Sequence, residues 1–135
     1  GTIAFLTPAV VAGPMTADGG ADVVGLAREY YRALDEHDYE ALSGLLATGF
    51  VHERPDLTLE GRDRFVRFMR AERPQTDTRH PVDGVYVPDG SDGGRDGDVA
   101  VRGRLLDADG DRITAFVDVF TFEGDRATRV ETFTR

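Results

Sequence analysis

Residues 116–122, Phe-Val-Asp-Val-Phe-Thr-Phe, alternate between two kinds of side chain and constrain the fold more than any other stretch. A period of two is typical of a β-strand with two different faces, and one face here carries Phe116, Asp118, Phe120 and Phe122. A carboxylate among phenylalanines is desolvated, which raises its pKa and allows it to donate a hydrogen bond or transfer a proton. The stretch therefore predicts a strand that contributes Asp118 to an apolar pocket.

The chain is long enough for one domain with a core of its own. It has 135 residues, of which 40% are hydrophobic, as in globular proteins. It has no cysteine, which excludes disulfides, a thiolate metal site and a cysteine nucleophile. It has no lysine, which excludes a Schiff-base lysine and a lysine-based phosphate loop. The net charge of −9 argues against nucleic acid and anionic membranes as partners.

The charged residues are strongly biased in type. Asp outnumbers Glu by 17 to 8, and all 16 basic residues are Arg. An Asp-rich acidic chain is typical of a halophile, because a salty cytoplasm screens the repulsion between carboxylates. A GC-rich genome, which favours Arg over Lys, would leave a similar bias. Both explanations concern habitat rather than function. We expect the protein to be cytoplasmic.

The first 20 residues differ from the rest of the chain. Residues 2–14 are mostly apolar and contain Pro8 and Pro14. Their apolar runs are shorter than the roughly 20 residues that a membrane span needs, and no positive charge precedes them as in a signal peptide. We expect residues 1–20 to form an N-terminal arm or extension and residues 21–135 to form the domain.

Helical spacing of apolar residues comes first in the domain, and strand-like alternation follows. Asp22 and Asp38 are placed to cap helices, and Gly49 is placed to end the second helix. The patterns predict helices over 23–36, 39–48 and 61–71, and strands over 50–54, 79–87, 98–106, 112–122 and 126–134. This order indicates an α+β fold with helices on one face of an antiparallel sheet.

Five short stretches of the chain occur in a recognisable order. They are Arg28–Leu34, Asp38–Leu42, Phe50–Pro55, Gly61–Phe65 and Val117–Gly124. Together they resemble the nuclear transport factor 2-like superfamily, especially its SnoaL-like and ketosteroid isomerase-like branches, over about residues 20–135. The resemblance implies three N-terminal helices on a strongly curved antiparallel sheet, a cone that encloses one cavity, usually in a homodimer. It implies no single activity, because the fold hosts isomerases, cyclases, dehydratases, epoxide hydrolases and non-enzymatic binders.

Within this resemblance, the ketosteroid isomerase pattern is kept only in part. Tyr30 and Asp118 fall at the positions of that family's oxyanion hole, which consists of a Tyr and a protonated Asp. The family's general base is an Asp just before the proline of the first strand, and this chain has Arg54 there. Because an arginine does not abstract a proton at ordinary pH, another residue would have to be the base.

Two other branches of the superfamily have catalytic residues at positions that can be located in this chain. His80 falls where the scytalone dehydratase-like branch has a catalytic His, and Asp35 lies near that branch's first-helix Asp, although Leu34 replaces its accompanying Tyr. The epoxide hydrolase branch needs an Arg two residues before the strand Asp, where this chain has Phe116. The resemblance therefore implies His80 as a candidate base and argues against epoxide hydrolysis.

His52 is a second candidate base because it shares a strand face with Phe50 and Arg54. Each candidate also has a structural interpretation: Asp118 could pair with Arg54, Tyr30 could belong to the core, and either histidine could be bonded within the sheet. The candidate catalytic residues are Asp118, Tyr30, His52 and His80, and the candidate ligand-binding residues are Arg54, Phe116, Phe120, Phe65 and Leu34.

Two aspartate-rich segments are better explained as turns than as calcium sites. Residues 93–98 loosely resemble one calcium-binding nonapeptide. Asp107, Asp109 and Asp111 resemble the opening of an EF-hand loop but lack its distal Glu and its flanking helices. Three scattered histidines and no cysteine argue against a transition-metal site. We expect no metal and no cofactor.

The sequence therefore predicts a SnoaL-like domain of the lyase or isomerase type that binds a small, apolar, oxygenated ligand in a central cavity. In this hypothesis Asp118 and Tyr30 polarise a carbonyl or hydroxyl, and His52 or His80 moves the proton. The alternative is a non-catalytic module for ligand binding, scaffolding or dimerisation. The sequence does not choose between them.

A homodimer is expected because the helices cover only one face of the sheet. The other face would be left bare in a single chain, and a two-fold contact through it would remove apolar area from water. We expect this face to carry Val99, Val101, Val117 and Val119.

Overall fold

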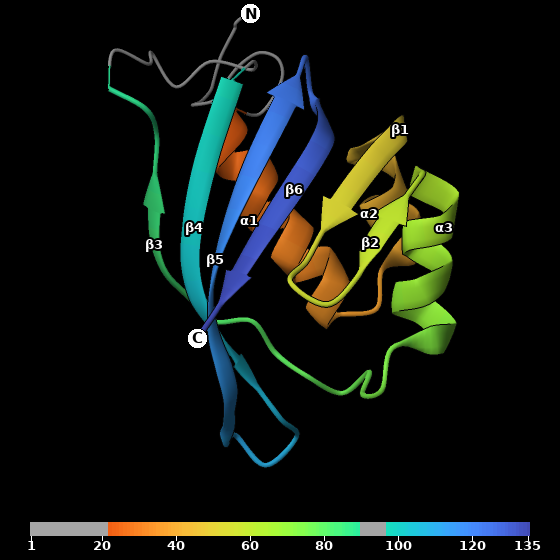
Figure 1. Cartoon of the computed structure of the whole chain (residues 1–135), viewed down its shortest axis with the longest axis vertical. Coiled ribbons are helices and arrows are strands. Elements are labelled where there is room, and N and C mark those ends of the chain that lie inside the picture. Colours follow the sequence, from red (N-terminus) through yellow and green to blue (C-terminus); the bar gives the residue numbers. More distant parts are fainter. Residues whose placement is uncertain (1–21, 90–96) are drawn as a thin grey trace, which may run out of the picture.

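A six-stranded sheet forms one layer of the domain and the helices form the other (Figure 1). The structure is a computed structural model that describes residues 22–89 and 97–135. The predicted arm over 1–20 and most of the nonapeptide-like stretch over 93–98 lie outside the described residues. The strand order is β2-β1-β6-β5-β4-β3. The strands are β1 (Leu46–Glu53), β2 (Thr58–Glu60), β3 (Val82–Tyr86), β4 (Gly97–Leu106), β5 (Arg112–Glu123) and β6 (Arg126–Thr134).

The first helix, α1 (Val23–Asp35), begins at the predicted cap. The side chain of Asp22 accepts a hydrogen bond from the backbone N–H of Gly25 at 2.9 Å. The apolar spacing of the helix buries one face, as predicted, and Figure 1 shows this helix crossing one face of the sheet behind β4, β5 and β6. At 13 residues it is the longest described helix, and no helix of the described part of the chain can span a membrane.

The second helix, α2 (Tyr39–Gly44), is capped by Asp38 as predicted but ends earlier than Gly49. Gly49 lies inside β1, which begins at Leu46. The chain leaves the helix there because fully buried Leu46 joins the sheet, where it pairs with Ala127 of β6.

The predicted α+β fold is confirmed, and the sheet is antiparallel except at one pair of strands. β1 runs parallel to β6, with Val51 opposite Arg129 and His52 opposite Val130. A parallel pair needs a crossover, which the chain makes through α3 and the β3–β5 meander. β2, which the sequence did not reveal, pairs with β1 and forms the edge of the sheet. At the other edge, β3 is shorter than the predicted strand over 79–87, and Arg79 forms only an isolated bridge to Leu106.

The third helix changes its winding halfway. α3 (Arg62–Arg67) continues as a π-helical turn, η1 (Phe68–Glu72), and the N–H of Arg73 closes it by bonding the carbonyl of Phe68 at 2.9 Å. The backbone of Arg73 is extended, so the chain turns away from the helix at this residue.

The two faces of β5 differ as the alternation predicts. Phe116, Asp118, Phe120 and Phe122 are buried, and the residues between them are only partly buried. The predicted strand over 98–106 is present as β4, but the placement of Val99 and Val101 on the uncovered face was wrong, because both are fully buried opposite Phe120 and Asp118. Of the four valines assigned to the uncovered face, Val117 and Val119 lie there.

Candidate functional site

A cavity of about 470 Å³ opens between α1 and the sheet. Its volume is in the range of small-molecule sites. Its walls come from α1, the end of β1, the segment between η1 and β3, and β4, β5 and β6. Of the predicted site residues, the cavity is lined by Asp118, Tyr30, His52, His80, Arg54, Phe116 and Leu34. Phe65 and Phe120 are fully buried in the core behind this wall and do not line the cavity.

The Asp118 carboxylate is buried in the cavity wall and accepts two hydrogen bonds. The hydroxyls of Tyr31 and Thr132 donate to its two oxygens, each at 2.5 Å. Burial raises the pKa of Asp118, and the hydrogen bonds from Thr132 and Tyr31 act in the opposite direction without cancelling it. Both hydroxyls can donate to the ionised carboxylate, and one of the two bonds must reverse when Asp118 is protonated.

The tyrosine bonded to Asp118 is Tyr31, and not the predicted Tyr30. Tyr30 packs edge-on against Tyr31 and Phe120 and stacks on Phe65. Its hydroxyl has no hydrogen-bond partner among the described residues, and the residue lines the cavity. The structure therefore brings two tyrosines to this wall, one bonded to the carboxylate and one with its hydroxyl available.

His52 is a neutral imidazole at one end of this hydrogen-bonded chain. Its Nε2 lies 2.8 Å from the Thr132 hydroxyl, which links it to Asp118. Burial and the positive charge of Arg54 lower the pKa of His52 to about 3, against an opposing effect of Asp56. A base with such a low pKa is weak at neutral pH, and the Nδ1 of His52 is buried without a partner among the described residues. Sequence reasoning missed Thr132, which joins the two predicted residues.

His80 is held by Asp35 at both its backbone and its ring. One carboxylate oxygen accepts from the backbone N–H of His80 at 2.9 Å, and the other lies 2.6 Å from Nδ1. This contact fixes the ring so that Nε2 is its free nitrogen, since no described residue bonds to Nε2. The ring lines the cavity and lies beside Tyr31, with centroids 5.9 Å apart. The arrangement is that of an imidazole base oriented by a carboxylate.

Arg54 does not pair with Asp118. Its guanidinium donates to both carboxylate oxygens of Asp56, at 3.1 and 3.2 Å, and lies over the ring of Phe68. The structural interpretation of Asp118 as half of an ion pair with Arg54 is therefore not supported by the contacts.

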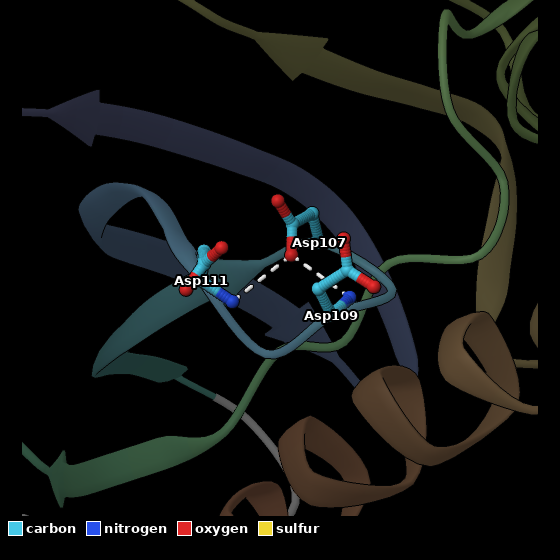
Figure 2. A group of neighbouring side chains, drawn as sticks. All are labelled: Asp107, Asp109 and Asp111. Atoms are coloured by element: carbon cyan, nitrogen blue, oxygen red, sulfur yellow. Dashed lines mark hydrogen bonds between the residues drawn. The ribbon is translucent and has the colours of Figure 1, made fainter.

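The cluster of Asp107, Asp109 and Asp111 forms the hairpin turn between β4 and β5 (Figure 2), and none of the three residues lines the cavity. One oxygen of Asp107 accepts from the backbone N–H groups of Asp109 and Asp111, at 3.0 and 2.9 Å. Gly110 has a positive φ of 87°, which suits the turn. These contacts explain the aspartates as turn formers.

The fold agrees with the comparisons to known proteins. The family model for the SnoaL-like domain matches residues 27–130. The chain belongs to the SnoaL-like domain family. No curated protein sequence matches the chain.

Several solved structures share the fold of this SnoaL-like domain. One is a nuclear transport factor 2-like protein of unknown function from Cytophaga hutchinsonii, with 16% identity over 88% of this chain and 95% of that one, at a TM-score of 0.71. Another is a provisionally named ketosteroid isomerase from Kribbella flavida, with 26% identity over 82% and 76% of the two chains, at a TM-score of 0.68. A third is a provisionally named polyketide cyclase from Sinorhizobium meliloti, with 20% identity over 81% and 94%, at a TM-score of 0.66.

Proposed function

We propose that this SnoaL-like domain is a cofactor-independent acid–base enzyme, a lyase or isomerase, that acts on a small, apolar, oxygenated ligand in its cavity. The observation that carries the proposal is the pairing of Asp35 with His80 at 2.6 Å beside the Tyr31–Asp118 hydrogen bond. An oriented imidazole and a buried carboxyl with a raised pKa are the two partners that proton transfer at carbon requires. The names of the Kribbella and Sinorhizobium relatives are compatible with such chemistry.

In the proposed reaction, His80 is the base and Tyr31 stabilises the developing negative charge. The Nε2 of His80 takes a proton from the carbon next to a carbonyl, and the electron pair moves onto the carbonyl oxygen. When Asp118 is protonated, it donates a hydrogen bond to the Tyr31 oxygen. The Tyr31 hydroxyl is then free to donate to the negatively charged carbonyl oxygen of the ligand. His80 finally returns the proton to another carbon in an isomerase, or to a departing hydroxyl in a lyase.

With His80 as the base, the reaction does not need a base at the position of Arg54. The ketosteroid isomerase-like base would come from the end of β1, where Arg54 is occupied by Asp56. His80 enters the cavity from the segment before β3 instead. The low pKa of His52 supports the choice of His80 between the two candidate histidines.

Replacing His80 with Gln should abolish proton transfer from a carbon acid. The probe is β-tetralone in deuterium oxide, whose exchange of hydrogen next to the carbonyl is followed by proton NMR. Wild-type protein should accelerate the exchange, and H80Q should reduce the acceleration by at least about 100-fold, the usual contribution of a general base. The matched control is Arg70→Met, because Arg70 is exposed on η1 and does not line the cavity.

The opposite outcome would favour the non-catalytic alternative. If wild-type protein exchanges the probe no faster than free imidazole at the same concentration, the domain is better described as a binding module. In that case the bond between His80 and Asp35 would only tie the start of β3 to α1. Loss of thermal stability in H80Q without any effect on exchange would support that structural role.

We also propose a homodimer that forms through the sheet face opposite the helices. Val117 lies opposite Phe133, and Val119 lies opposite Ala100, which in turn faces Tyr86. Phe133 is 50% exposed and Tyr86 is 52% exposed in the single chain. This strip of apolar side chains also contains two charged residues, Arg102 opposite Val117 and Glu131 opposite Val119, and it is the surface that we propose a second copy covers.

Placing a charge on this strip should dissociate the dimer. Val119→Arg should shift wild-type dimer to monomer in light scattering at micromolar concentration and high salt, because burying an unpaired guanidinium is costly. Ala71→Arg serves as the control, because Ala71 is exposed on η1 in the helical layer. A wild-type protein that is monomeric under these conditions would contradict the proposed assembly.

A further inference from the structure

Arg73 borders the cavity without an acidic partner. It follows η1 directly and is partly buried, and no carboxylate of the described residues forms an ion pair with it. Its neighbour Glu72 is engaged by Arg64 and Arg67, at 3.0 and 3.2 Å. In a chain with 25 acidic residues and 16 arginines, acids to neutralise Arg73 are abundant. The positive charge of Arg73 is nevertheless left open at the cavity.

The hydrogen-bond donors of Arg73 are used only in part. Nη2 donates to the hydroxyl of Tyr39 at 3.2 Å and to the carbonyl of Thr76 at 3.4 Å, and both acceptors are neutral. Nε is buried and has no partner, and Nη1 has none among the described residues either. A guanidinium offers five N–H groups in a planar fork that matches a carboxylate. Nε is closed off from the cavity, so a bound acceptor would reach the guanidinium through Nη1.

One further group of the cavity wall can help to bind an anion. The hydroxyl of Tyr30 has no partner among the described residues, and Tyr30 lines the same cavity as Arg54 and Arg73. Burial and the charge of Asp118 raise the pKa of Tyr30, and the charges of Arg54 and Arg73 oppose this in part, so the hydroxyl keeps its proton and can donate. Arg54 is neutralised by Asp56, so Arg73 supplies the open charge. Asp118 is not its counter-ion, since Tyr31 and Thr132 occupy both carboxylate oxygens.

We propose that the ligand carries a carboxylate, which Arg73 binds with help from the hydroxyl of Tyr30. The apolar body of the ligand would lie against Leu34, Met69 and Phe116, which also line the cavity. This inference rests on the proposed function, because it takes the same cavity as the site. It adds the chemical class of the ligand, a small apolar carboxylate, and a residue that determines specificity.

The test compares two probes of nearly equal shape and different charge. Naphthoate and its neutral analogue naphthamide are titrated by calorimetry into wild-type protein near neutral pH. Wild type should bind naphthoate at least about tenfold more tightly than naphthamide. Arg73→Met keeps the length of the side chain and should abolish this preference while retaining the affinity for naphthamide. Arg70→Met, an exposed arginine of η1 outside the cavity, should keep the preference.

The results separate this inference from the proposed enzyme activity. Equal affinity for the two probes, no binding of naphthoate, or a preference that survives in R73M would overturn the carboxylate site. None of these results bears on whether His80 moves a proton, which the exchange of β-tetralone measures. Arg73→Lys provides a second variant: it keeps the charge but loses the N–H groups of the guanidinium, and it should retain only part of the preference. A full preference in R73K, with none in R73M, would show that the charge of Arg73 alone carries the preference, which would still support the carboxylate site.

Discussion

Replacing Asp118 with Ala should destabilise the domain by roughly 2–4 kcal/mol, whereas Asp118→Asn should change the free energy of unfolding by less than about 1 kcal/mol. Alanine leaves the Tyr31 hydroxyl, which is buried, and the Thr132 hydroxyl without their acceptor. Asparagine can accept from Thr132 and donate to the Tyr31 oxygen, so that only the Tyr31 hydroxyl reverses. Both variants are compared with wild type by thermal and urea unfolding at fixed salt.

The difference in stability between D118N and wild type should change with pH in a direction that the pKa of Asp118 determines. Because burial raises the pKa of Asp118 in the folded protein above its ordinary value of 3.8, the folded state binds this proton more tightly than the unfolded state. The stabilising effect is therefore present at low pH and is lost as the pH rises through the raised pKa. The stability of D118N relative to wild type should accordingly increase with pH.

Two results would contradict this account of Asp118. A loss of several kcal/mol in D118N that is rescued by Arg54→Met would show an ion pair between Asp118 and Arg54, which the contacts do not support. A loss in D118A no larger than that in Asp77→Ala would show that the buried hydrogen bonds contribute little. Asp77 is the matched control because it is exposed.

The elements whose side chains follow a regular period along the sequence were predictable. The alternation from Phe116 to Phe122 gives the buried face of β5, and the helical spacing gives the buried face of α1. Each pattern is local, so it does not depend on how elements meet. The parallel pairing of β1 with β6 was not predictable in this way, because it joins residues about 80 positions apart, such as His52 and Val130.

Local sequence patterns were also insufficient to predict which single residues meet in the site. Tyr30 and Tyr31 both lie on the buried face of α1, and only the rotation of the helix over the sheet decides which hydroxyl reaches Asp118. Thr132 carries no signal of its own until β6 is aligned with β5, which places it opposite Asp118. Arg73 follows a π-helical turn that no local pattern indicated.

Acid should unfold the wild-type domain more readily than the His52→Gln variant. Burial lowers the pKa of His52 to about 3 in the folded protein, so the imidazole is neutral there, while the unfolded chain takes up the proton near the ordinary value of 6.5. The unfolded state therefore binds more protons between these two values. The contribution of His52 to stability is fully present above the ordinary value and is lost as the pH falls toward the lowered one.

Glutamine can keep the contact with Thr132 but does not titrate, so the difference between the two proteins isolates His52. By about pH 4 the wild type should have lost about 3 kcal/mol more than the variant, relative to neutral pH. Only the change with pH is compared, so a constant cost of the substitution does not enter. The measurement is urea unfolding at a series of pH values, in which the titrating carboxylates are common to both proteins.

The protonation of the His52 ring can also be followed directly by NMR, which does not depend on the stability measurement. The Cε1–H resonance of His52 in wild-type protein should keep its neutral position down to about pH 4. A midpoint near the ordinary pKa, or parallel stability curves for wild type and H52Q, would mean that the ring is open to solvent. His52 would then recover the pKa of an effective base and compete with His80 for the catalytic role. A neutral ring throughout this range would leave His80 as the base to test.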